Sequence, residues 1–126
     1  MGRKVKSAMG KNKKGKQKIT LKGIVASPGI VQGKVRVVKS PKDILMAKRE
    51  EIIITPFLSP DFITLLKKNG QIKGIVTNEG GATCHAAILA REFKIPYIAG
   101  AGKATKMLKN NMDIILDGEK GTVYEI

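Results

Sequence analysis

Residues 74–92, with the sequence GIVTNEGGATCHAAILARE, decide the fold. The apolar residues 74–77 predict the end of a buried strand, and the pair Gly80-Gly81 predicts a tight turn. The residues from Ala86 onward are good helix formers. The order of strand, glycine turn and helix therefore places His85, the single histidine of the chain, near a helix N-terminus.

That position has chemical consequences. The first backbone N–H groups of a helix lack intrahelical partners, and together with the helix dipole they form an anion site. Gly80 and Gly81 let the backbone approach a ligand closely, and Thr83 can act as N-cap or turn its hydroxyl toward an anion. A neutral imidazole in this place is a nucleophile. We therefore predict a phosphohistidine at His85, with phosphoryl-binding support from Gly80, Gly81, Thr83 and Cys84. The competing interpretation of His85 is a partly exposed polar residue without chemistry.

Residues 80–92, followed by Ile95-Pro96 and Gly100, closely resemble the phosphohistidine signature of the PEP-utilising enzymes. The signature is most similar to that of phosphoenolpyruvate synthase, because Cys84 stands where the dikinases usually have serine. The resemblance runs from about Ile19 to Ile126. It implies the mobile, swivelling phosphohistidine domain of that family, an α/β fold of three layers (β/β/α) with a partly parallel central sheet. In the family this domain carries a phosphoryl group between an ATP-binding domain and a pyruvate-binding barrel, and the motif gives His85 the carrier role.

The composition limits which classes of protein this chain can belong to. A chain of 126 residues with 42% hydrophobic residues suggests one domain with a modest core. One cysteine cannot form an internal disulfide, and one cysteine with one histidine does not make a structural zinc site. No apolar run is long enough to span a membrane. We therefore expect a cytoplasmic protein without a metal site.

The formal net charge is +14, and residues 1–18 contain eight basic residues and no acid, so residues 19–126 keep a net charge of +6. This pattern predicts a disordered basic tail over residues 1–18, followed by the phosphohistidine domain over 19–126. One interpretation of the tail is an arm for nucleic acid or an acidic partner. A solubilising extension is favoured, because no aromatic residue interleaves the lysines.

Alternating strands and helices predict a mixed α/β domain whose central strands are parallel. We expect strands over 19–27, 33–38, 51–55, 72–77, 95–99, 112–117 and 121–125, and helices over 40–49, 59–69, from His85 onward, and over 104–108. Ser59 is expected to cap the second helix, whose core stripe is Phe62, Leu65 and Leu66. In the His85 helix, Ile88 and Leu89 are expected to contact the core.

Other chemistries fit less well. Cys84 and His85 are adjacent, and adjacent helical residues point about 100° apart, which argues against a catalytic dyad. The carboxylate pairs Asp113 with Asp117 and Glu50 with Glu51 have no spacing typical of a glycosidase or a metal site. Arg91 either balances phosphoryl charge or forms a structural salt bridge, and the second interpretation is favoured.

The sequence and the resemblance together predict a free-standing phosphoryl carrier. Its donor would be an ATP-binding protein and its acceptor a pyruvate- or PEP-binding protein, because 126 residues leave no room for either site. ATP and Mg²⁺ are expected on those partners, and no cofactor on this domain alone. One alternative is a catalytically silent phosphate-binding or protein-interaction module of the same fold. Another is the small subunit of an aconitase-like hydratase, against which the His85 signature argues.

Overall fold

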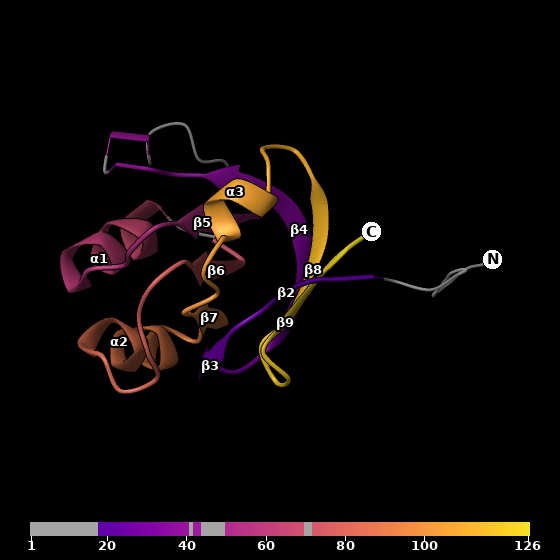
Figure 1. The fold of residues 1–126 in the computed structure, drawn as a ribbon. Helices are drawn as coiled ribbons and strands as arrows, with labels where there is room; N and C mark the ends of the chain where they lie inside the picture. The colour runs from indigo at the N-terminus through magenta and orange to yellow at the C-terminus, as the bar shows by residue number, and fades with distance from the viewer. Residues whose placement is uncertain (1–17, 41, 44–49, 70–71) are drawn as a thin grey trace.

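The computed structural model describes residues 18–126 except 41, 44–49 and 70–71. These residues form one eight-stranded sheet and three helices (Figure 1). The strands are β2 (Lys18–Lys22), β3 (Ile24–Ser27), β4 (Ile30–Val37), β5 (Glu51–Thr55), β6 (Gly74–Thr77), β7 (Tyr97–Ala99), β8 (Asp113–Asp117) and β9 (Thr122–Glu125). The helices are α1 (Pro60–Asn69), α2 (His85–Phe93) and α3 (Ala104–Met107). The strand order is β2-β9-β8-β4-β5-β6-β7-β3.

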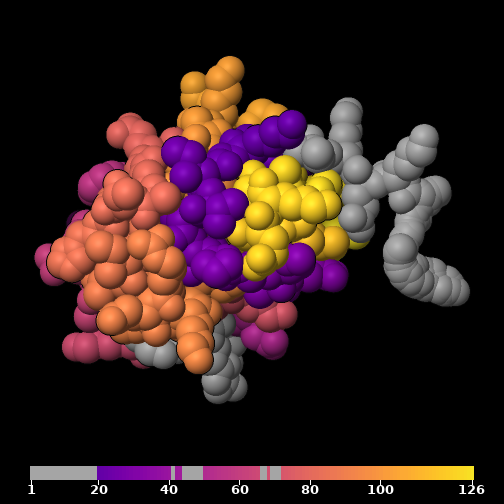
Figure 2. Space-filling view, turned by 90° about the horizontal axis from the view of Figure 1, so that it is seen from below, coloured from indigo at the N-terminus to yellow at the C-terminus, as the bar shows by residue number. Residues whose placement is uncertain are grey.

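The sheet is curled so that its two edges meet. Strands β2 and β3 occupy opposite ends of the strand order, yet only Gly23 separates them in the chain. The amide of Gly23 donates to the carbonyl of Gly121 at 2.8 Å, and a Cβ on Gly23 would lie 2.6 Å from the carbonyl oxygen of Ala99. Figure 2 shows the indigo N-terminal strands lying between the orange α2 region and the yellow C-terminal hairpin. The prediction of one strand over 19–27 is therefore wrong, because Gly23 divides it between two edges.

The central strands are parallel, as expected. Strands β4 to β7 pair in parallel, and antiparallel pairing joins β8, β9 and β2 on one side and β3 on the other. Every residue of β5 and β6 is buried. This is typical of parallel strands that are covered on both faces, and it explains their continuous apolar sequences.

Two apolar cores lie on the two faces of these strands. The outer core packs α1 and α2 against Ile53, Ile75 and Tyr97, and the inner core packs Ile52 and Ile98 against the strands opposite and α3. Figure 1 shows α1 and α2 on one side of the parallel strands and β2, β8 and β9 on the other. The order of layers is therefore β/β/α, the fold class that the family resemblance implied.

The helices confirm some sequence expectations and correct others. The amide of Phe62 donates to the Ser59 hydroxyl at 3.1 Å, so the predicted cap of α1 is confirmed. Leu65 is 44% exposed and Ile88 is 46% exposed, so neither is a core residue as predicted. Ile63 and the alanines of α2 face the outer core instead. The helix predicted over 40–49 lies mostly outside the described residues, as do the basic segment 1–17 and the side chain of Leu66.

Gly23→Ala is expected to destabilise the fold by about 2–3 kcal/mol, because its Cβ would overlap the Ala99 carbonyl oxygen at the closure of the sheet. Gly81→Ala is the matched control. Its φ is not positive and no atom lies within 4 Å of its Cβ position, so its effect should stay within about 0.5 kcal/mol. Urea unfolding of both variants measures the difference, and equal stabilities would contradict the role of Gly23.

Candidate functional site

The candidate site lies at the carboxyl ends of the parallel strands. The loop over residues 78–84 leaves β6 at Thr77 and enters α2 at His85, whose side chain is exposed. The first amides of α2 that find a helical acceptor belong to Ala87 and Ile88, which donate to the Cys84 carbonyl at 3.1 and 3.2 Å. The amides of His85 and Ala86 have no acceptor among the described residues. They are therefore available to an anion in front of the helix.

The cap of α2 differs from the prediction. Cys84, not Thr83, occupies the N-cap position, because the helix begins one residue later than a Thr83 cap requires. The Cys84 side chain makes no cap hydrogen bond and packs against the outer core, whereas Thr83 is exposed. A cap without a side-chain acceptor leaves the first amides unpaired. The first turn of α2 also contains no acidic residue, so no carboxylate of this turn competes for an incoming anion.

The two glycines before the cap have different surroundings. Gly80 has φ +123°, and a Cβ there would lie 3.1 Å from the Tyr97 hydroxyl. At Gly81 no atom lies within 4 Å of the position that a Cβ would take. Glycine at position 80 thus allows the positive φ of the turn and the close approach of Tyr97, whereas the space beside Gly81 is open to a ligand.

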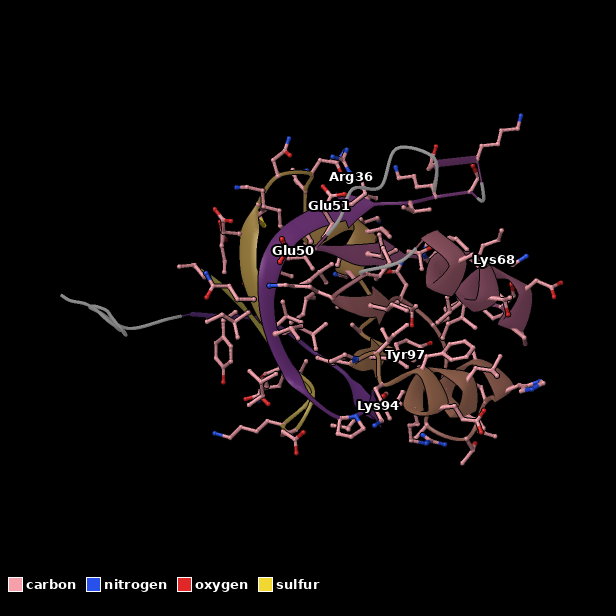
Figure 3. All side chains as sticks on the ribbon, turned by 180° about the vertical axis from the view of Figure 1, so that it is seen from behind. Arg36, Glu50, Glu51, Lys68, Lys94 and Tyr97 are labelled. Carbon is pink, nitrogen blue, oxygen red and sulfur yellow. The ribbon has the colours of Figure 1, made fainter. Side chains whose placement is uncertain are left out.

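Buried hydroxyl groups hold the start of the loop. The Thr77 hydroxyl donates to the Glu79 carbonyl at 2.7 Å and lies 3.2 Å from the Tyr97 hydroxyl, with which it shares a buried hydrogen bond. Figure 3 shows Tyr97 between the parallel strands and α2. Burial raises the pKa of Tyr97 above its usual 10.0, the Thr77 hydrogen bond opposes this rise, and the nearby Cys84 thiol adds to it.

A second set of hydrogen bonds ties this loop to the segment after β7. The Asn78 side-chain amide donates to the Thr105 hydroxyl at 2.8 Å, and its oxygen accepts from the Thr105 amide at 3.0 Å. The backbone adds bonds from Ala101 to Thr77 at 2.8 Å and from Gly102 to Asn78 at 3.0 Å. The loop before His85 and the start of α3 are therefore fixed relative to each other.

Arg91 supplies the third tie. Its Nη1 donates to the carbonyl oxygens of Ala26 at 2.5 Å and of Ala82 at 3.1 Å. These bonds connect α2 to β3 and to the loop before His85. The salt bridge predicted for Arg91 is wrong, because its partners are carbonyl groups and no ion pair involves it among the described residues. The spacing of charges along the chain contains no signal for such carbonyl partners.

A polar cleft of about 660 Å³ lies elsewhere, where β5 and β6 begin. Its charged groups form three ion pairs, Lys34–Asp113 at 3.1 Å, Arg36–Glu51 at 3.0 Å and Lys73–Glu50 at 3.9 Å. Figure 3 shows Arg36, Glu50 and Glu51 grouped there, away from Tyr97. Paired charges of this kind are structural, and the described residues contain no cluster of metal-binding side chains. His85 therefore remains the candidate site.

The family model described as "PEP-utilising enzyme, mobile domain" matches residues 47–121, which include the whole site. The chain belongs to this family. Among curated relatives, a probable phosphoenolpyruvate synthase of Archaeoglobus fulgidus is 48% identical over 108 residues, covering 86% of this chain and 14% of that protein. The phosphoenolpyruvate synthase of Pyrococcus furiosus is 42% identical over 107 residues, covering 85% of this chain and 13% of that protein. The chain thus spans about a seventh of these relatives.

Solved structures share the fold. An Enzyme I structure is 34% identical with a TM-score of 0.55, over 63% of this chain and 32% of that one. Aconitase X of Thermococcus kodakaraensis has a TM-score of 0.64 at 24% identity, over 84% of this chain and 97% of that one. At that identity the second likeness concerns the fold alone. No helix in the described part of the mobile domain is long and apolar enough to cross a membrane.

Tyr97→Phe is expected to cost about 1 kcal/mol of stability at pH 7, because the buried hydrogen bond between the Thr77 and Tyr97 hydroxyls is lost. The folded-state pKa of Tyr97 lies above the unfolded value of 10.0, so wild-type stability is retained below that pH and falls as pH rises above it. The variant has no phenol to ionise at this position, so the gap between the two proteins should shrink above about pH 10. Urea unfolding at pH 7 and above about pH 10 measures this gap, and a constant gap would contradict the raised pKa of the buried Tyr97 hydroxyl.

Proposed function

We propose that this domain carries a phosphoryl group on His85. The donor would be an ATP-binding protein and the acceptor a pyruvate- or PEP-type site, each supplied by a partner chain, with ATP and Mg²⁺ bound there. The observation that supports this most is an exposed imidazole at the first residue of α2, next to two amides without acceptors among the described residues.

The reaction needs little from the domain itself. A nitrogen of the neutral His85 imidazole attacks the phosphorus of the donor, an N–P bond forms, and the donor P–O bond breaks with its electron pair leaving on the donor oxygen. An acceptor oxygen then attacks the same phosphorus and releases the imidazole. The amides of His85 and Ala86 and the open space beside Gly81 would hold the phosphoryl oxygens, and the helix dipole favours their charge.

Labelling tests the carrier role. The chain is mixed with ³²P-phosphoenolpyruvate and the Archaeoglobus fulgidus phosphoenolpyruvate synthase as donor, and the labelled 13.6 kDa band is separated by size. We expect an acid-labile, alkali-stable label that is lost in His85→Ala and retained in Cys84→Ala. Repeating the comparison of the three chains with ³²P-labelled ATP in place of phosphoenolpyruvate tests ATP as the source of the phosphoryl group. If neither donor labels the wild-type chain, although the synthase labels itself, the carrier role is contradicted and a silent phosphate-binding module of the same fold is favoured.

Gly81→Val tests the phosphoryl cradle. Its side chain would enter the open space beside Gly81, where no atom lies within 4 Å of the Cβ position and where the proposal places the phosphoryl oxygens. We expect the labelling rate to fall about tenfold or more, as for the loss of one preorganised donor, while the free energy of unfolding changes by less than about 1 kcal/mol. A labelling rate equal to wild type would show that the phosphoryl group lies elsewhere.

A further inference from the structure

Helix α3 carries basic charge that the rest of the chain does not neutralise. Residues 100–112 contain Lys103, Lys106 and Lys109 and no acidic residue. All ten acidic residues of the chain lie among the described residues, and none of them forms an ion pair with these three lysines. By contrast, the cations of the polar cleft, Lys34, Arg36 and Lys73, each pair with a carboxylate.

The packing of α3 decides which side chains face solvent. Ala104 and Leu108 are fully buried in the inner core, and α3 packs against β5, β6 and β2. Lys103, Lys106 and Met107 lie on the exposed side, where Met107 is 46% exposed. Figure 1 shows α3 over β5 and β6. The result is a basic surface with an apolar thioether among its lysines, which we call the α3 surface (Lys103, Lys106, Met107 and Lys109).

The α3 surface is fixed to the His85 loop. Two hydrogen bonds join Asn78 to Thr105, and the backbone of Gly102 donates to Asn78 at 3.0 Å. The α3 surface and the loop before His85 are therefore held in one arrangement, which a partner that contacts both would meet in a fixed orientation. Unpaired lysines at such a place raise the association rate with an acidic partner and select its orientation.

We propose that the α3 surface is the docking surface for an acidic protein face that borders the phosphoryl donor site of the partner. This proposal rests on the proposed carrier function. A protein partner fits better than a nucleic acid, because Met107 offers adaptable apolar contact and residues 100–112 contain no aromatic side chain on which a base could stack. The partner should present Asp and Glu residues around an apolar patch.

Charge reversal tests the proposal with a matched control. Lys103→Glu/Lys106→Glu changes the α3 surface, and Lys68→Glu/Lys94→Glu makes the same change in net charge at lysines on α1 and at the end of α2 (Figure 3). Binding of the full chain to the Archaeoglobus fulgidus synthase is measured by surface plasmon resonance. At about 0.05 M salt we expect the first variant to bind at least tenfold more weakly than wild type and the second to stay within about twofold.

The salt dependence of binding and a variant of Met107 separate the electrostatic contribution of the lysines from the apolar contribution of Met107. At about 0.5 M salt the difference between the charge variants should largely disappear, because the lysines are exposed. Met107→Ala should weaken binding by a similar factor at both salt concentrations. Equal binding by both charge variants, or no binding of the wild-type chain at either salt, overturns the proposal. So does binding of a single-stranded RNA oligonucleotide that Lys103→Glu/Lys106→Glu abolishes while synthase binding is unchanged.

Labelling of the wild-type chain distinguishes this proposal from the carrier function. If wild type is labelled on His85 but the two charge variants bind alike, only the docking surface is wrong. If the variants bind as expected but no donor labels His85, only the carrier function is wrong. Circular dichroism and urea unfolding of each variant check that the fold is retained.

Discussion

The architecture depends on one residue of chain between two opposite edges of the sheet. Gly23 connects β2 to β3, its amide donates to the Gly121 carbonyl, and the Ala99 carbonyl oxygen and the Ile98 side chain leave no room for a Cβ. The sheet must therefore curl until β9 and β7 approach each other. This curl encloses the inner core and buries the second face of the parallel strands, so that every residue of β5 and β6 is buried up to Thr77, where the site loop begins.

The site combines an exposed imidazole, the nucleophile of the proposed carrier function, with a loop that is held at three points. Thr77 bonds to Tyr97 beneath the loop, Asn78 bonds to the segment after β7, and Arg91 bonds to the carbonyl of Ala82 in front of the helix. His85 can thus be reached by a partner while the amides beside it keep their positions. Preorganised donors of this kind hold developing charge without further ordering of the backbone.

The sequence predicted the parallel strands, the glycine turn and the position of His85, because apolar runs, glycine pairs and helix formers are local signals. It did not predict the break at Gly23, since the two halves of that segment pair with strands far along the chain. It offered Thr83 as a possible cap, because threonine has a side-chain acceptor, whereas Cys84 occupies the N-cap position and packs against the outer core. The carbonyl partners of Arg91 depend on the assembled fold and leave no pattern in the sequence.

The pairing of β2 with β9 sets where a longer chain would enter and leave this unit. Lys18 lies opposite Glu125 on neighbouring antiparallel strands, so the two connections emerge side by side (Figure 1). A module with adjacent entry and exit points can be inserted into another polypeptide without separating the flanking segments. Two linkers attached at one corner also leave the opposite surfaces free, so the whole unit can pivot about that corner as a rigid body.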